Sequence, residues 1–343
     1  MKVCAITKKF PKEDTVNFLG FEKFENMAGD FIFLPARINF KALEADEFRG
    51  KKIVYYELEE PNRFFSKDQK FRRDDFGDDN FYKILSACPH TTEWLNKRQG
   101  NNKRTHVFVP FDEDNIPPVT EKIYDVIYVG GIHSSQMLNT VRTIKKFNHK
   151  YVSLSEALTY KLWRNTKIAR KILSYLPKKK NRYITDQNIT YREKLKLTSQ
   201  SKITLVHTLL NANAKHVSNI QKTEGWRGNK AFACIPEKSL LNTIGNYLFQ
   251  REYPVPQQKG RIFEAVFCRS LLLCQKDQFR EIERYFTPDK EFVYYEEGCL
   301  EEKIKEILSD WPKYSAVIEN AFRRAQSEYT TRNFVEKYLK NVG

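Results

Sequence analysis

The sequence predicts an α/β protein built from two Rossmann-like, doubly wound domains that face each other across a cleft. Short apolar runs alternate with helical or loop segments from the start of the chain, a pattern typical of parallel strands that are covered on both faces. The alternation breaks at the charged, proline-containing stretch 112–122 and then resumes. A chain of 343 residues is long enough for two hydrophobic cores, so we expect a domain boundary at this stretch.

The first predicted domain, residues 1–118, carries five strand candidates and one clear helix. The helix is the segment 91–99, TTEWLNKRQ, which separates the last two strands. The strand candidates are Val3–Ile6, Phe31–Leu34, Ile53–Tyr56, Ile84–Cys88 and Val107–Val109. Several of these runs are uninterrupted apolar stretches, which favours strands buried on both faces.

The second predicted domain, residues 119–325, repeats the scheme. A glycine pair, Gly130 and Gly131, follows its first strand and precedes an amphipathic helix from Ser135 to about Phe147. Helices follow from Glu302 onward, and for the last one, 326–343, a crossing back to the first domain is one arrangement. The strand candidates are Val126–Val129, Tyr151–Leu154, Ile203–His207, Ser270–Cys274 and Phe292–Tyr295.

Positive charge is concentrated in one segment. The net charge is +16, yet residues 1–118 hold 20 Lys or Arg against 20 Asp or Glu, whereas residues 142–230 hold 21 against 4. This asymmetry favours a polyanionic partner, which is nucleic acid, an anionic membrane surface or a phosphate-rich substrate. Solvated helix faces are the alternative. Within the segment, Lys178, Lys179 and Lys180 form an exposed basic loop after a predicted basic helix.

Cysteine usage and hydropathy bear on the compartment. The six cysteines form no C-x-x-C pair and most lie in apolar runs, so we expect a reduced, cytoplasmic protein rather than a disulfide frame or a zinc site. The N-terminal apolar run is too short for a signal peptide, and no stretch approaches the roughly 18 apolar residues of a membrane span. We expect no dedicated metal site, and the oligomeric state stays open.

The stretch 254–274, PVPQQKGRIFEAVFCRSLLLC, is the strongest candidate for nucleotide binding. If a helix opens at Arg261, then Arg261 and Glu264 lie three residues apart and share a face. The guanidinium can grip a diphosphate through two hydrogen bonds, and the carboxylate can accept from both ribose hydroxyls. A surface Arg–Glu ion pair is the common alternative. The glycine turn at 130–131 adds an anion-binding helix start, although GGIHSS lacks the full spaced-glycine fingerprint.

An acidic stretch follows the third predicted strand of the first domain. Glu57, Glu59 and Glu60 precede Pro61, and ligands of such sheets bind at the carboxyl ends of the strands. One of these carboxylates can therefore act as general base on an acceptor hydroxyl. A solvated acidic turn explains the same residues equally well.

Three runs together resemble the sugar-nucleotide glycosyltransferases of the GT-B architecture. They are YDVIYVGG at 124–131, RIFE at 261–264 and the apolar strand after it. Within that class the sequence is most similar to the phage DNA β-glucosyltransferase family, which glucosylates 5-hydroxymethylcytosine in duplex DNA from UDP-glucose. The resemblance runs in short patches along nearly the whole chain. It implies a UDP-sugar donor, UDP-glucose first, duplex DNA as partner, and a virus-encoded protein in the host cytoplasm.

The resemblance also implies roles for individual residues. Glu59 takes the position of the catalytic aspartate, and Asn39 and Phe40 lie on the loop that approaches the gap left by a flipped base. For Phe40, an ordinary core position is the alternative. The residues that match the donor site are Gly130, Gly131, Arg261 and Glu264.

Two departures from the family pattern matter. His133 and Met137 replace the two arginines of the donor-phosphate loop, so His133 becomes a donor-site candidate and the identity of the sugar is left open. The earlier glutamate of the E-x7-E motif of retaining relatives would fall on Pro256, which favours inversion. The implied mechanism is a single in-line displacement with Glu59 as base and Arg261 on the leaving UDP.

Two other functions fit parts of the same pattern. An enzyme with this fold and donor can instead use a surface polysaccharide, a lipid-linked sugar or a protein as acceptor. A non-catalytic nucleic-acid-binding protein on a degenerate transferase fold is the other possibility. The intact set of Glu59, Arg261 and Glu264 argues against this last function.

Overall fold

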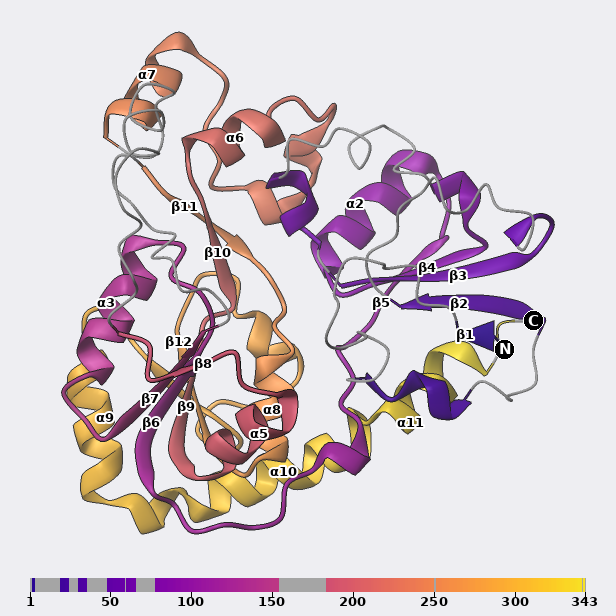
Figure 1. The fold of residues 1–343 in the computed structure, drawn as a ribbon. Helices are drawn as coiled ribbons and strands as arrows, with labels where there is room; N and C mark the ends of the chain where they lie inside the picture. Colours follow the sequence, from indigo (N-terminus) through magenta and orange to yellow (C-terminus); the bar gives the residue numbers. More distant parts are fainter. Residues whose placement is uncertain are drawn as a thin grey trace.

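The computed structural model describes residues 2–3, 19–24, 30–35, 48–58, 60–65, 78–153, 183–249, 251–340 and 342. Two parallel sheets form two lobes, which lie side by side in Figure 1. The chain passes from the first lobe to the second through residues 107–123, and the C-terminal helices run along the base of both lobes. The α/β class and the two parallel sheets agree with the expectation from the sequence.

The first sheet has five parallel strands in the order β1-β2-β3-β4-β5. Its strands are buried on both faces: Phe31 and Phe33 belong to one core cluster, while Ile32 and Leu34 belong to another. This is why the run has no polar alternation. The strands are β1 (Lys2–Val3), β2 (Phe31–Pro35), β3 (Lys52–Glu57), β4 (Lys83–Ser86) and β5 (Arg104–His106).

Short helical segments connect these strands. Helix α2 (Pro89–Gln99) joins β4 to β5, and it begins with a proline at its first position and ends at Gly100 in the left-handed conformation, as proline and glycine favour. The 3-10 segments of this half are η1 (Phe21–Phe24), η4 (Asn62–Phe65), η6 (Asp78–Asn80) and η7 (Glu113–Asn115).

The second sheet has six parallel strands in the order β13-β12-β9-β6-β7-β8. The first strand of this sheet in the chain, β6, therefore lies next to the fourth, β9, with Val126 opposite Ile203. This is the Rossmann order, and the direction of winding reverses between β6 and β9. The strands are β6 (Tyr124–Val129), β7 (His149–Ser153), β8 (Asp186–Gln187), β9 (Ser201–Val206), β12 (Leu271–Gln275) and β13 (Val293–Tyr295).

Capped helices cover this sheet. The Ser134 hydroxyl accepts from the Met137 N–H at the start of α3, and Thr190 and Glu193 form a reciprocal capping box at the start of α5. The helices are α3 (Ser135–Ile144), α5 (Tyr191–Ser199), α8 (Arg261–Phe267), α9 (Leu300–Ser309) and α10 (Ser315–Glu328), with 3-10 segments η10 (Glu281–Arg284) and η11 (Trp311–Tyr314).

A long excursion separates β9 from α8. Its base is an antiparallel hairpin in which Leu209 lies opposite Pro256, and its outer part carries two helices (Figure 1). The excursion consists of β10 (Leu209–Ala212), α6 (Ala214–Ile220), η8 (Trp226–Gly228), η9 (Lys230–Phe232), α7 (Leu240–Leu248) and β11 (Tyr253–Pro256).

The C-terminal residues pack on the first sheet. The Phe334 ring lies 5.2 Å from that of Phe21 and 5.0 Å from that of Tyr56, and the Thr331 hydroxyl donates to the Leu19 carbonyl at 2.5 Å. These contacts come from α11 (Thr331–Phe334), which the π-helix η12 (Val335–Leu339) continues.

One strand prediction is wrong and others shift. Residues 107–109 follow β5 instead of forming it, because their apolar side chains serve the core between the domains: the Phe108 ring lies 5.3 Å from Tyr329 and 5.5 Å from Phe334. The strand expected to reach Cys88 ends at Ser86, and Cys88 begins helix α2. Residues 254–256, taken as loop, belong to β11. Leu154 and Val3's neighbour Cys4 lie outside the described residues.

Candidate functional site

The reversal point of the second sheet brings two loops together at the carboxyl ends of its central strands. The glycine pair Gly130–Gly131 follows β6, and His207 and Thr208 follow β9. In open α/β sheets, ligands bind in the crevice at this point. The next elements to reach it are the loop 257–260 and the first turn of α8.

Arg261 lies directly against the glycine turn. Its Nη1 donates to the Val129 carbonyl at the end of β6, and a Cβ at position 130 would lie 2.5 Å from the same nitrogen. Gly130 has a φ of +142°, a conformation that side chains disfavour. The close approach of Arg261 therefore depends on glycine at this position.

The surroundings of Arg261 are electropositive. Burial lowers the pKa of His207 to about 4, and Arg261 and Lys259 lower it further. Burial likewise lowers the pKa of His133, with added repulsion from Lys259 and Arg261. Both imidazoles are therefore neutral near pH 7. Among the described residues, Arg261 forms no ion pair with a carboxylate, so the charge it carries at this point is available to an anion.

Glu264 lies on the same helix but contacts a different element. Its Oε1 accepts from Lys194 Nζ of α5 at 2.7 Å, and Lys194 lies 4.2 Å from the centre of the Tyr191 ring. The Glu264 side chain is 17% exposed. The structure therefore rules out a direct Arg261–Glu264 surface ion pair, since each of the two has its own partner.

The N-terminus of α3 is already occupied by oxygen acceptors. Besides the Ser134 cap, Glu252 accepts from the backbone N–H of Ser135 at 3.3 Å and from its hydroxyl at 2.9 Å. Burial raises the pKa of Glu252, while these two hydrogen bonds oppose the rise. The expectation that this helix start is open to a phosphate is thus modified: a carboxylate of the chain lies there.

A cavity of about 560 Å³ opens between α3, the hairpin and the ends of β12 and β13. Its lining is mainly polar, because Gln136 donates to Gln275 at 2.7 Å and Thr208 to Asp277 at 2.5 Å beside it. Carboxylates and amides that face a cavity suit a polyhydroxylated ligand. Six of the lining residues are Ser135, Gln136, Asn211, Glu252, Gln275 and Asp277.

Two acidic residues flank Glu59 in the first domain, and both are buried. Glu57 accepts from the Tyr55 hydroxyl at 2.7 Å. Glu60 accepts from Arg104 at 2.7 Å and from Ser86 at 2.6 Å, and burial raises its pKa while Arg104 opposes the rise. A carboxylate held by two partners is a structural element rather than a free base. The solvated acidic turn is excluded for these two positions.

The carboxyl ends of the first sheet meet the second domain through polar contacts. His90 Nε2 lies 2.7 Å from Glu281 Oε1, and His106 Nε2 lies 3.1 Å from the Tyr285 hydroxyl. In the orientation that satisfies both ends of its amide, Gln258 donates to the Ala87 carbonyl and accepts from the backbone N–H at 109, both at 3.0 Å. The loop before Arg261 therefore touches both domains.

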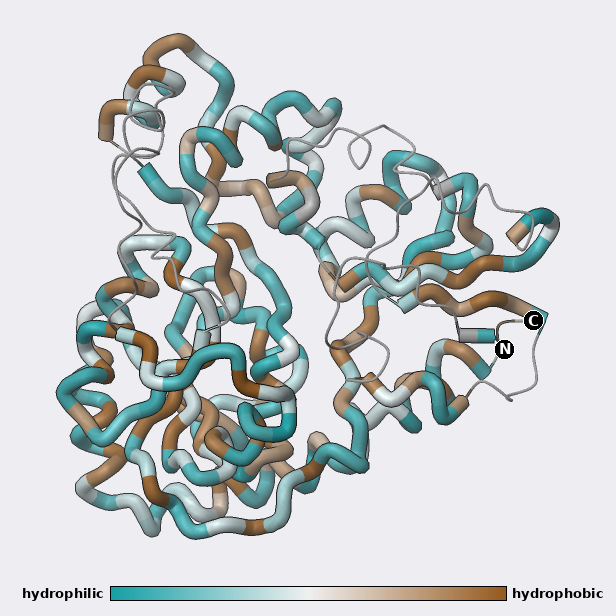
Figure 2. The backbone as a smooth tube through the Cα atoms, in the orientation of Figure 1, coloured by the Kyte–Doolittle hydropathy of each residue, from teal (hydrophilic) through white to brown (hydrophobic). Residues whose placement is uncertain are grey.

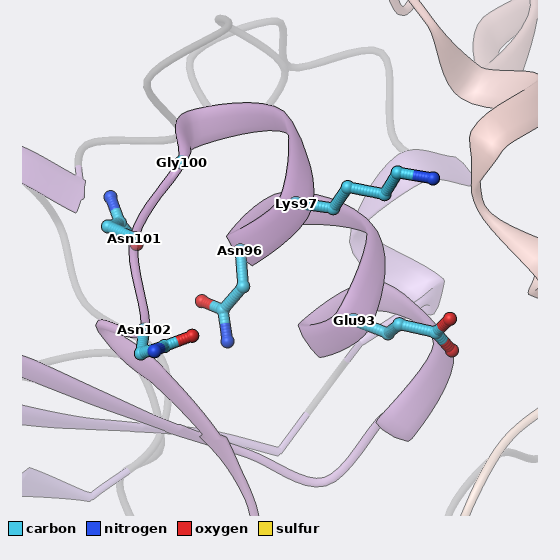
Figure 3. A pocket seen from close by; sticks show the side chains of 6 residues that line it. All are labelled: Glu93, Asn96, Lys97, Gly100, Asn101 and Asn102. Carbon is cyan, nitrogen blue, oxygen red and sulfur yellow. The ribbon is translucent and has the colours of Figure 1, made fainter.

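A second cavity, of about 420 Å³, lies on the outer surface of the first domain around the end of α2 (Figure 3). Figure 3 shows Asn96 pointing into it between helix and loop. The Asn96 amide, however, exchanges two hydrogen bonds with the backbone of Arg104, at 2.8 and 3.0 Å. These bonds hold the α2–β5 connection, so this cavity is part of a structural turn.

The structure brings together only some of the candidate residues. Gly130, Gly131, His133 and Arg261 lie in one place, and Glu264 lies one helical turn further along α8. Sequence reasoning missed three residues of this place: His207, Gln258 and Lys259. The signal for them was present in the strand end at 206–207 and in QQKG just before α8. The other candidates lie outside the described residues: Glu59, Asn39, Phe40, Lys178, Lys179 and Lys180.

Two searches of the described residues gave negative findings. No group of three or more His, Cys, Asp or Glu side chains there is arranged to hold a metal ion. Likewise, none of the helices in the described part of the chain is both long and apolar enough to cross a bilayer.

Comparison with protein families identifies one match. Residues 250–340 match the family model described as glycosyl transferase-like. The matched segment contains β11, Lys259, Arg261 and Glu264. None of the curated protein sequences is significantly similar to the chain.

Solved structures share the fold over most of the chain. HepE from Anabaena, in complex with UDP and glucose, superposes with a TM-score of 0.53 and 12% identity over 90% of this chain and 76% of its own. Sucrose-phosphate synthase from Thermosynechococcus elongatus gives a TM-score of 0.51 and 9% identity over 92% and 75%. For S. aureus TarM the values are 0.52 and 9%, and the chain spans 57% of TarM. The neighbours are GT-B glycosyltransferases, so the predicted GT-B architecture is confirmed.

Proposed function

We propose that the chain is a glycosyltransferase that moves a sugar from a UDP-sugar to a hydroxyl acceptor. The observation that carries the proposal is the position of Arg261, whose guanidinium lies against the glycine turn at the reversal point of a Rossmann sheet. The glycosyl transferase-like match over 250–340 covers the same arginine. HepE and TarM were solved with UDP, which supports UDP as the nucleotide here.

The donor would bind with its diphosphate at the cationic end of the site. Arg261 and Lys259 supply positive charge, and the N–H groups of the glycine turn supply further donors. Glu264 would accept from the ribose hydroxyls after releasing part of its contact with Lys194. The sugar would then extend toward the polar cavity beside α3 and Gln275. UDP-glucose is the first donor to test.

The proposed chemistry is a single displacement with inversion. A carboxylate, assigned to Glu59, removes the proton of the acceptor hydroxyl, and the oxygen forms a bond to the anomeric carbon as the bond to UDP breaks. The electron pair of that bond leaves with the β-phosphate, whose developing charge Arg261 stabilises. Glu57 and Glu60 do not compete for the role of base, since both carboxylates are buried and hydrogen-bonded.

The proposed acceptor is a 5-hydroxymethylated pyrimidine in duplex DNA. The support is the sequence resemblance to the phage DNA β-glucosyltransferase family and the excess of 21 cations over 4 acids in residues 142–230. In a duplex the target base must leave the stack to reach a catalytic site, a step for which Asn39 and Phe40 are assigned. Lys178, Lys179 and Lys180 would then contact phosphates.

A second acceptor class is favoured by one feature of the described residues. Helix α7 exposes leucine and phenylalanine side chains at the outer end of the excursion, which suits an enzyme that works on a lipid-linked sugar or a surface glycan. The same donor site and chemistry would serve this acceptor.

An assay of UDP release distinguishes these acceptors and tests the activity itself. A panel of UDP-sugars is incubated with hydroxymethylated duplex DNA, unmodified duplex DNA, a lipid-linked sugar and no acceptor. We expect release that depends on one UDP-sugar and on one acceptor class. If no UDP-sugar binds or is consumed with any acceptor, the proposed function is wrong.

A further inference from the structure

Helix α7 presents apolar side chains to solvent at the outer end of the excursion. In Figure 1 it lies far from both sheets, and in Figure 2 the same segment is coloured as hydrophobic. The exposed fractions are Leu240 76%, Leu241 83%, Ile244 46%, Tyr247 36%, Leu248 70% and Phe249 72%. No other group of neighbouring residues in the described part of the chain exposes as many large apolar side chains.

The burial pattern of α7 is the reverse of that in an ordinary surface helix. Its only buried residue is Asn246, whose side chain accepts from the Tyr253 hydroxyl at 2.6 Å. Leu241, Ile244 and Leu248 follow the three- and four-residue spacing of one helix face, and this face points away from the protein. A contiguous exposed apolar face of this kind marks an interaction site.

Cationic residues border this apolar face. The helix LLNTIGNYL contains no charged residue, and Lys238 and Arg251, both exposed, stand just before and just after it. Residues 215–251 contain six Lys or Arg against two Asp or Glu, and the two acids pair with arginines, Glu237 with Arg227 and Glu224 with Arg98. The net charge around the apolar face is therefore positive.

We propose that α7 inserts into the surface of an anionic lipid bilayer. A membrane suits the feature better than a protein does. A stable protein interface takes roughly 20–30 residues on each side, whereas six exposed apolar side chains project from one short helix. Leucines and an aromatic ring that enter the headgroup boundary, with lysine and arginine held at the anionic surface, are the elements of an interfacial helix.

The location of α7 determines which part of the protein faces the lipid. The hairpin of β10 and β11 leaves the carboxyl end of β9 and returns to the loop before α8. Membrane-bound α7 therefore turns the carboxyl ends of the second sheet toward the bilayer. This inference does not depend on the proposed glycosyl transfer, because the surface and its charge exist without a donor.

Vesicle flotation tests the inference on the full chain. The vesicles are phosphatidylcholine with and without phosphatidylglycerol, and duplex DNA is a separate arm. The test variant is Leu241→Gln with Leu248→Gln. The matched control is Val119→Gln with Ile123→Gln, since Val119 and Ile123 are also exposed, at 79% and 49%, but lie away from α7. A charge variant changes Lys238 and Arg251 to alanine.

We expect binding to the anionic vesicles only, weakened roughly tenfold for each leucine replaced and roughly fivefold for each cation removed. The Val119/Ile123 control should bind as the native chain does. Equal binding by the Leu241/Leu248 variant would overturn the inference. So would a native chain that ignores vesicles and forms a dimer, or binds DNA, through α7. UDP affinity, measured by calorimetry on each variant, reports separately on the proposed function.

Discussion

The guanidinium of Arg261 and the backbone of Gly130 occupy adjoining space. Nη1 would lie 2.5 Å from a Cβ at position 130, and it donates to the carbonyl of the preceding Val129. The two residues are 131 positions apart in the chain, and the Rossmann strand order brings them together. Their fit makes the glycine as important to the proposed donor site as the arginine.

Replacing Gly130 with alanine should impair donor binding. The new methyl group would displace Arg261, and the φ of +142° is unfavourable for alanine, a strain on the order of 1–3 kcal/mol. We expect UDP affinity, measured by calorimetry, to fall by about tenfold or more. Gly245→Ala in α7 is the control, because nothing lies within 4 Å of a Cβ there. An unchanged affinity in Gly130→Ala would contradict the assigned site.

Arg261→Ala and Glu264→Gln should each weaken donor binding while the fold persists. Loss of a charge-assisted contact costs about 1.5–3 kcal/mol, which corresponds to roughly 10- to 150-fold in affinity. Arg269→Ala is the matched control: this arginine lies just beyond α8 and its guanidinium stacks 3.5 Å from the centre of the Phe322 ring. The assignment is wrong if both site variants bind UDP as tightly as the Arg269 variant.

Glu59→Ala should abolish transfer and leave UDP binding nearly unchanged, since a base acts on the acceptor. The expected loss of turnover is roughly 100- to 10,000-fold. Glu57→Gln is the control for turnover. Glu60→Gln should instead lower the free energy of unfolding by roughly 3–5 kcal/mol, because it leaves Arg104 buried without its partner. Normal turnover in Glu59→Ala together with loss in Glu57→Gln would move the base to Glu57.

Acidification should destabilise the protein below about pH 6.5. Burial, as the largest cause, lowers the pKa of His106, His207 and His216 to about 4 each. Between the unfolded value near 6.5 and about 4, the unfolded chain binds protons that the folded chain does not. Stability therefore falls as pH drops through this window, by up to roughly 3 kcal/mol per histidine.

Urea unfolding at about pH 7 and pH 5 measures this effect. His207→Gln should lose its share of the pH dependence, even though the substitution itself disturbs the contact with Thr140, 3.1 Å away. The comparison is therefore between slopes against pH, not between absolute stabilities. A slope identical to that of the native chain would show that His207 does not contribute.

Local patterns predicted much of the fold. Helix α8 begins and ends at Arg261 and Phe267 as expected, because its spacing of apolar residues is set within the helix. The strand at 107–109 was wrong because a core between domains also needs apolar residues, and three letters do not reveal which structure buries them. Strand β11 was hidden by Pro254 and Pro256, which suit the edge of a two-stranded hairpin.

The candidate site was predictable only where a motif carries it. Arg261 and Glu264 stood out within RIFEAVF, but their separate partners, the β6 carbonyl and Lys194, depend on strand order and helix packing. His207 is a lone histidine at the end of an apolar run. Lys259 is one of many lysines. Only the neighbourhood of β6 and β9, which is a long-range property of the sheet, places these two beside Arg261.

The basic segment 142–230 leads to the last prediction, which concerns duplex DNA. If its cations neutralise phosphates, the logarithm of the binding constant should fall linearly with the logarithm of salt concentration, with a slope near 0.9 for each phosphate contacted. Changing Lys178, Lys179 and Lys180 together to alanine should then reduce the slope by up to about 2.7 and weaken binding to all sequences alike.

The matched control for this experiment changes Lys290, Lys305 and Lys313 to alanine, since these exposed lysines lie outside the basic segment and the net charge changes equally. A polyanion that senses only total charge would respond to both triple variants in the same way. A polyanion bound by the basic segment responds to the first alone, and a hydroxymethylated duplex should bind more tightly than its unmodified counterpart at every salt concentration because its target base can be flipped into the site. If the native chain shows no salt-dependent affinity for duplex DNA, nucleic acid is excluded as acceptor, and the lipid-linked or surface glycan takes its place.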